Sequence, residues 1–183
     1  DADYTKVDEA VKKANSLKKT DYKDFTGVEK AVKAVVRGKN ITEQEEVDKM
    51  AKAIEDAIKE AKIDKTDISY INAHGTSTYY NDLYETRAIK NVFEDYAKNI
   101  PISSTKSMIG HLLGAAGAVE SIICVRALNE GFIPPTIGYT ESEEELDLDY
   151  VPNVARERVI NAAISDSLGF GGHNAAILLK KLK

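Results

Sequence analysis

Three short stretches of the chain combine histidine with glycine and small hydroxyl residues, a combination that suits catalysis. They read NAHGTST at 72–78, SSTKSMIGHLLGAAGA at 103–118 and SDSLGFGGHN at 165–174. Histidine changes charge near neutral pH, so it serves as a proton carrier or a hydrogen-bond donor in active sites. An imidazole or an ammonium buried without partners costs free energy. The placement of Lys106 and His111 beside an apolar segment therefore indicates a task for both, and His74 raises the same question.

Each stretch also has a structural explanation when it is taken singly. His74 could be a hydrogen-bonded core histidine, His111 could cap or pack, and GFGG could be a turn. The single cysteine, Cys124, lies in SIICVRAL among apolar residues, which is typical of inert packing rather than of a nucleophile. One cysteine excludes an internal disulfide and a cysteine-rich metal site. No metal or organic cofactor is expected.

Composition limits the classes of partner. The 183 residues carry a net charge of −5 without a basic patch, which argues against nucleic acid. The longest nearly apolar run, around Met108–Val119, is too short to span a membrane. The first ten residues lack the apolar core of a signal peptide. We therefore expect a cytoplasmic protein that engages neither nucleic acid nor membrane.

The elements that must position these residues alternate in type from residue 63 onward. The pattern predicts a strand ending at His74, a helix from Asp82 to about Ala97 that a capping box with Glu85 would start, and a short strand at 101–105. A helix from about 107 to 130 and apolar strands at 159–165 and 174–180 follow. The last two strands barely alternate, so we expect them to be covered on both faces. This alternation of strands and helices is typical of an α/β domain.

The first part of the chain has a different pattern. Apolar stripes at helical spacing predict three helices within 1–62, with Thr42 and Glu45 as a capping box for the third. The pattern resembles the FIVAR-type helical modules of bacterial surface proteins, and an all-α three-helix bundle is expected at 1–62, before an α/β domain at 63–183. The junction falls within the helix at 47–62, which fits both parts.

Together, the three stretches resemble, in order and spacing, the C-terminal half of the β-ketoacyl-acyl-carrier-protein synthases. The resemblance runs from about Ala53 to Lys183 and includes NDLYETRAI, PPTIGYT and LDLDYVPN. It implies half of a thiolase-like fold, in which two duplicated α/β halves enclose the site. It also implies acyl transfer: malonyl-carrier protein loses carbon dioxide, and the carbanion attacks an acyl thioester held on a cysteine. The implied partners are acyl carrier proteins with acyl and malonyl thioesters.

The resemblance also implies roles for individual residues. His74 and His111 match two neutral imidazoles that donate hydrogen bonds to the malonyl thioester oxygen, and a helix start at His111 would favour its neutral form. Lys106 would pair with a carboxylate; Glu85 matches an acid of that network, and its capping box is an equal alternative. The remaining matches are a gate and oxyanion donor at Phe170, substrate-tunnel hydroxyls at Thr76 and Thr78, and mobile-loop glycines at Gly171 and Gly172. The family more often has Asn and Phe where this chain has Asp166 and Leu168.

The segment that would carry the nucleophilic cysteine does not match any part of this sequence. We therefore expect the chain to lack full condensing activity alone, and to form a homodimer or to bind a complementary N-terminal half. The alternative is a non-catalytic interaction or scaffold protein, of natural or artificial fusion origin, in which the helical bundle binds a partner.

Overall fold

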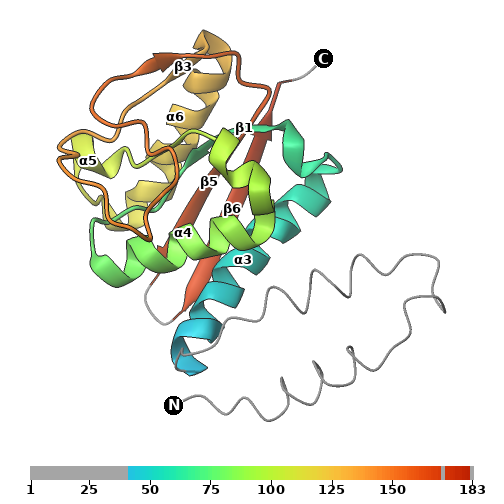
Figure 1. Cartoon of the computed structure of the whole chain (residues 1–183). Helices are drawn as coiled ribbons and strands as arrows, with labels where there is room; N and C mark the ends of the chain where they lie inside the picture. The colour runs from blue at the N-terminus through green and yellow to red at the C-terminus, as the bar shows by residue number, and fades with distance from the viewer. Residues whose placement is uncertain (1–40, 170–171, 182–183) are drawn as a thin grey trace. The chain divides into compact units, whose positions relative to one another are not determined.

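The computed structural model describes residues 41–169 and 172–181. Residues 46–183 form one compact unit around a four-stranded sheet of order β2-β1-β5-β6 (Figure 1). Strands β1 (Ile68–Asn72), β2 (Ile102–Ser103) and β5 (Ala162–Gly169) are parallel, and β6 (His173–Lys180) runs antiparallel to β5. Ile71 of β1 pairs with Ile102 on one side and with Ile164 on the other. The observed architecture is the predicted α/β class.

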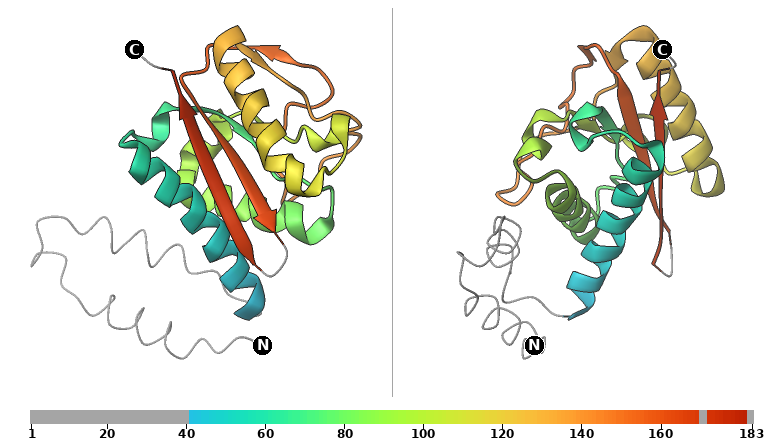
Figure 2. Two further views of the ribbon diagram at one scale, coloured as in Figure 1. Left: turned by 180° about the vertical axis from the view of Figure 1, so that it is seen from behind. Right: turned by 90° about the vertical axis from the view of Figure 1, so that its right-hand side faces the viewer.

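Helices cover the two faces of this sheet differently. Helices α3 (Ile41–Ala61) and α4 (Tyr79–Phe93) pack on one face, and α6 (Ala116–Glu130) packs on the other (Figure 2). Alternate residues of β5 enter the two cores: Ile164 joins the first and Ala163 the second. Because β1 and the first five residues of β5 are buried on both faces, these stretches show no alternation of buried and exposed residues.

Helix α3 confirms the third predicted helix. Its buried residues Val47, Met50, Ala51 and Ile54 recur at helical spacing and pack into the same core as β1 and α4. This helix is therefore the one that precedes β1 in the α/β unit. The two earlier predicted helices lie at residues 1–40, outside the described residues, so the FIVAR-like bundle stays a prediction.

Helix boundaries are set by local backbone geometry. Helix α4 begins at Tyr79, after the extended residue Thr78, rather than at Asp82 as expected. Helix α6 ends at Glu130, and the next residue, Gly131, caps it in the left-handed conformation common at helix C-termini. The smaller elements are the helices η2 (Lys65–Asp67), η3 (Glu94–Asn99), α5 (Lys106–Ile109) and η4 (Leu113–Ala115), and the paired strands β3 (Phe132–Ile133) and β4 (Arg156–Glu157).

Two expectations were wrong. The continuous helix from 107 to 130 is broken into α5, η4 and α6, because Gly110 and Leu113 adopt positive φ angles of 73° and 50° that no α-helix accepts. Strand β6 is not covered on both faces, because it lies at the sheet edge and Ile177 is 50% exposed. Within the described ranges, no helix is long and apolar enough to cross a membrane.

Candidate active site

Parallel strand order brings the three sequence stretches to one edge of the sheet. Asn72 at the end of β1 pairs with Ser103 at the end of β2 and with Ser165 in β5. The chain that follows β1 and β2 therefore emerges at the same edge, which is where open α/β sheets place their ligand sites. His74 follows β1, and Lys106 and His111 follow β2.

Glu85 of α4 holds the turn that carries His74. Its carboxylate accepts hydrogen bonds from the main-chain N–H groups of His74, at 2.7 Å, and Gly75, at 2.9 Å. Glu85 is buried and α4 begins well before Asp82, so the capping-box alternative was wrong. Gly75 has a φ of +39°, and a Cβ there would lie 2.5 Å from Ser104 Cβ, so only glycine fits.

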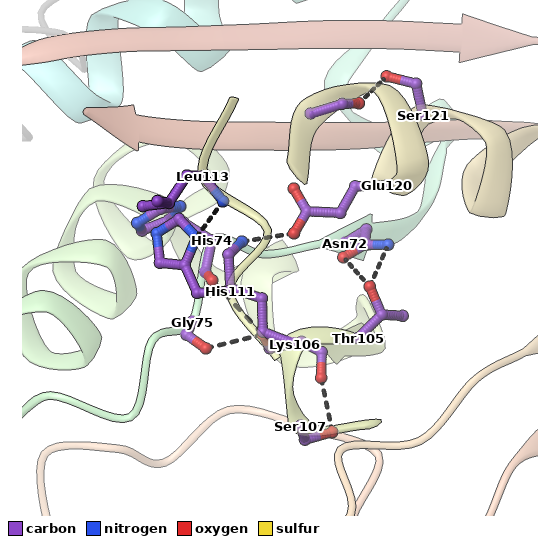
Figure 3. A network of polar contacts seen from close by, with 12 residues as sticks. Asn72, His74, Gly75, Thr105, Lys106, Ser107, His111, Leu113, Glu120 and Ser121 are labelled. Carbon is purple, nitrogen blue, oxygen red and sulfur yellow. Dashed lines mark hydrogen bonds and ion pairs between the residues drawn. The ribbon is translucent and has the colours of Figure 1, made fainter. Parts of the chain in front are cut away.

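The two histidine rings are in contact. Their centroids are 5.3 Å apart and the rings are nearly perpendicular, in an edge-to-face arrangement (Figure 3). The N–H of Leu113 donates to His111 Nδ1 at 3.1 Å, which places the proton of the neutral imidazole on Nε2. His74 is buried, and its Nδ1 has no hydrogen-bond partner among residues 41–169 and 172–181. His111 lies between α5 and η4, so the expected helix start at His111 was wrong.

Lys106 forms a buried ion pair with Glu120 of α6 (Figure 3). The side chains are only 5% and 1% exposed, so each charge depends on the other for solvation. Sequence reasoning expected a carboxylate partner for Lys106 but did not find Glu120. Its signal was present, because Glu120 interrupts the apolar run LLGAAGAVESIICV.

The electrostatics keep His74 neutral. Burial, followed by the positive charge of Lys106 and the proximity of His111, lowers the pKa of His74 to about 4. A neutral imidazole at pH 7 has one N–H to donate and one nitrogen that accepts. The site therefore holds a hydrogen-bond donor rather than a cation at this position.

A cavity of ≈ 520 Å³ opens beside these groups and is lined by Gly75, Thr76, Glu85, Lys106 and His111, among others. Thr76 Oγ1 lies 2.9 Å from Thr78 Oγ1, and Thr78 is exposed. The structure thus brings His74, His111, Lys106, Glu85 and Thr76 together.

Of the three predicted loop residues, the structure describes only Gly172. Gly172 lies against α3, where an added Cβ would be 3.5 Å from Lys49 Nζ. Phe170 and Gly171 fall outside the described residues. His173 lies exposed at the start of β6.

Cys124 has the environment of a packing residue. It is fully buried in α6, and burial raises the pKa of its thiol to about 12, so it is not a thiolate at neutral pH. The part of the chain that the structure describes contains no group of three or more His, Cys, Asp or Glu side chains that could hold a metal ion.

Comparisons with known proteins agree with this geometry. A family model described as "Beta-ketoacyl synthase, C-terminal domain" matches residues 28–140. The 3-oxoacyl-[acyl-carrier-protein] synthase 2 of Synechocystis sp. (strain PCC 6803) is 49% identical over 130 residues, covering 71% of this chain and 31% of the relative.

Solved structures give the same result. The ketosynthase of "AntDE:AntF (apo): type II PKS acyl-carrier protein in complex with its ketosynthase bound to the hexaketide" is 41% identical, with a TM-score of 0.71 over 73% of this chain and 33% of that one. "The ishigamide ketosynthase/chain length factor" is 38% identical, with a TM-score of 0.72 over 75% and 34%.

The fold is that of a thiolase-like ketosynthase, with two adjacent imidazoles carried by the segments that follow two neighbouring parallel strands. The chain belongs to the β-ketoacyl synthase family and matches its C-terminal domain. It spans about a third of the length of the curated relative.

Proposed function

We propose that this chain is the C-terminal part of a β-ketoacyl-acyl-carrier-protein synthase and supplies the decarboxylation half of a condensing site. The neutral imidazole of His74 and the imidazole of His111 would donate hydrogen bonds to the malonyl thioester oxygen as enolate charge develops. Such preorganised donors are typically worth about 3 kcal/mol each toward a reaction barrier. The single observation that carries the proposal is the facing pair of rings, 5.3 Å apart, with the Lys106 charge behind His74.

The other residues would support this chemistry. Glu85 would hold the His74 turn through its two main-chain hydrogen bonds. Lys106, paired with Glu120, would keep His74 unprotonated rather than transfer a proton itself. Thr76 and Thr78 would line the path of the carrier-protein arm. Phe170 as gate, with Gly171 and Gly172 beside it, stays a prediction from the sequence.

The acylated cysteine would come from the rest of the synthase. The thiol of Cys124 is fully buried, so a substrate cannot reach it. The chain spans only about a third of the length of its relative. Exposed apolar residues on α6 and β6, Ile122, Val125 and Ile177, offer a surface for that remaining portion. The partner of this face is therefore proposed to be the N-terminal two thirds of a synthase; a stable monodisperse monomer in its presence would contradict this.

The remaining partners and the location follow from the same proposal. Acyl carrier proteins bearing acyl and malonyl groups would be the substrates; one ketosynthase of known structure was solved with its acyl carrier protein. The cytoplasm is the proposed location, because the one buried thiol requires no oxidising compartment.

The test is carbon dioxide release from malonyl-carrier protein by the chain mixed with the N-terminal two thirds of the Synechocystis relative. His74→Ala and His111→Ala should each lower the rate about 100-fold, the usual effect of removing one such donor. His173→Ala is the matched control, since His173 is exposed at the start of β6, and it should retain the rate. Release that persists in both site variants would contradict the proposal and favour the non-catalytic scaffold.

A further inference from the structure

A second buried pair, of two carboxyl groups, lies beneath the His74 turn. Glu85 of α4 and Asp166 of β5 are 4% and 3% exposed, and their carboxyl groups lie within hydrogen-bonding reach of each other. A hydrogen bond between two carboxyl groups requires a proton on one of them, because an ionised carboxylate only accepts. Two adjacent buried carboxylates would also repel each other strongly.

The surroundings decide which group carries the proton. Glu85 accepts from the N–H groups of His74 and Gly75 and, at 3.2 Å, from the side-chain amide of Asn81. Three donors favour its ionised form. Among the described residues, the buried Oδ1 of Asp166 has no hydrogen-bond partner. The proton therefore belongs to Asp166, which donates to Glu85.

Other titratable groups adjoin the pair from the elements packed around it. They are Asp82 on α4, His74 after β1, Lys106 on α5 and Cys124 on α6, and Glu120 on α6 pairs with Lys106. Lys106 is the cation of this set, and it is already paired with Glu120. Burial, followed by the Glu85 charge, raises the pKa of Asp166 well above its usual range, and burial raises the pKa of Glu85.

We propose that Asp166 is a positioning residue: in its protonated form it donates a hydrogen bond to Glu85, which in turn holds the N–H groups of His74 and Gly75. When Asp166 ionises at higher pH, this hydrogen bond is lost and the two carboxylates repel. The His74 turn then loosens. An asparagine at 166 would donate at every pH, so the aspartate makes the support of the turn dependent on pH. The link to catalysis rests on the proposed function, whereas the protonation state does not.

The test follows the side-chain carboxyl carbons of the full chain by ¹³C NMR across a pH titration. The Asp166 resonance, assigned by its absence in Asp166→Asn, should keep the shift of a neutral acid at pH values where exposed carboxyl groups are ionised. Asp166 titrating together with the exposed groups would overturn the proposal. This measurement uses the wild-type chain without substrate, so it is independent of whether the chain decarboxylates anything.

The amide resonances of His74 and Gly75 provide the second readout. In the wild-type chain they should shift in step with the ionisation of Asp166. The shift should disappear in Asp166→Asn and persist in the matched control Asp56→Asn, which removes an exposed carboxylate paired with Lys52. Amide shifts of equal size in wild type and Asp166→Asn would contradict a positioning role. If Asp166→Asn does not fold, Glu85→Gln serves, because a neutral amide at 85 should let Asp166 titrate closer to its usual range.

Discussion

The two halves of the candidate site are built in different ways. The buried half consists of His74, Gly75, Glu85, Lys106 and Glu120, most of whose polar groups have partners inside the chain. The exposed half is the segment 108–113 around His111, where Met108, Ile109, Leu112 and Leu113 are all more than a third exposed. The contacts of this chain hold the buried half in place. In the other half, apolar side chains lie exposed, and none of the described residues covers them.

This difference indicates where the chain depends on itself and where it depends on a partner. Changes in the buried half should alter the stability of the isolated chain. Replacements of exposed apolar side chains in the other half should change its stability little and act mainly when the rest of a synthase is present. Four experiments separate these outcomes.

The largest effect is expected at the buried ion pair. Glu120→Ala leaves the Lys106 ammonium without a partner and should lower the free energy of unfolding by about 3–5 kcal/mol. Denaturant unfolding of the chain measures this. The double variant Lys106→Met/Glu120→Leu removes both charges and should recover most of the loss. A Glu120→Ala chain of wild-type stability would mean that the pair is solvated and that the buried half is not preorganised as described.

A glycine from each half sharpens the comparison. Gly75→Ala and Gly110→Ala both force a side chain into a positive φ, which costs about 1–3 kcal/mol. At Gly75 the new Cβ also meets Ser104 at 2.5 Å, whereas at Gly110 nothing lies within 4 Å. The melting temperature of Gly75→Ala should therefore be well below that of Gly110→Ala in thermal unfolding. Equal losses would show that Ser104 moves aside and that the turn is not tightly packed.

The pH dependence of stability tests the neutral state of His74. Its pKa falls from an ordinary 6.5 to about 4 in the folded chain. Between these two values the imidazole is protonated in the unfolded chain and neutral in the folded chain. His74 therefore contributes a loss of stability as the pH falls from 6.5 through about 4, with no contribution above that range. Urea unfolding should show this component in the wild-type chain and not in His74→Gln.

The comparison between the two chains isolates the effect, because the carboxyl groups contribute equally to both. A wild-type curve that runs parallel to the His74→Gln curve through this pH range would mean that His74 is protonated as readily in the folded state as in the unfolded one. The electrostatic role of Lys106 would then be wrong.

The smallest effect on stability is expected in the exposed half. Leu113 is 68% exposed and has a φ of 50°, which asparagine tolerates, so Leu113→Asn should change the free energy of unfolding by no more than about 0.5 kcal/mol. The same replacement at buried Leu128 should be strongly destabilising. In a titration with the N-terminal two thirds of a synthase, Leu113→Asn should weaken binding. Unchanged affinity would remove this segment from the interface.

Local sequence signals were sufficient for the main elements. The apolar runs predicted β1, β5 and β6 with their types, the helical spacing predicted α3, and a capping box at Asp82 predicted α4 with its start three residues too late. The site residues His74, Lys106 and His111 were indicated by the order and spacing of the motifs together, through the family resemblance, and by no motif singly. These features depend on residues that are close in sequence, so the pattern of residue types is enough to predict them.

Long-range contacts decided the rest. The pairing of Lys106 with Glu120, and of Glu85 with the His74 turn and Asp166, joins groups on different elements, so no local spacing specifies it. The break in the helix before α6 arises from the backbone angles at Gly110 and Leu113, which place His111 opposite His74. Sequence alone therefore determined which chemical groups this protein has and on which strand ends they lie. Tertiary packing decided which of them touch, because burial and charge act through space rather than along the chain.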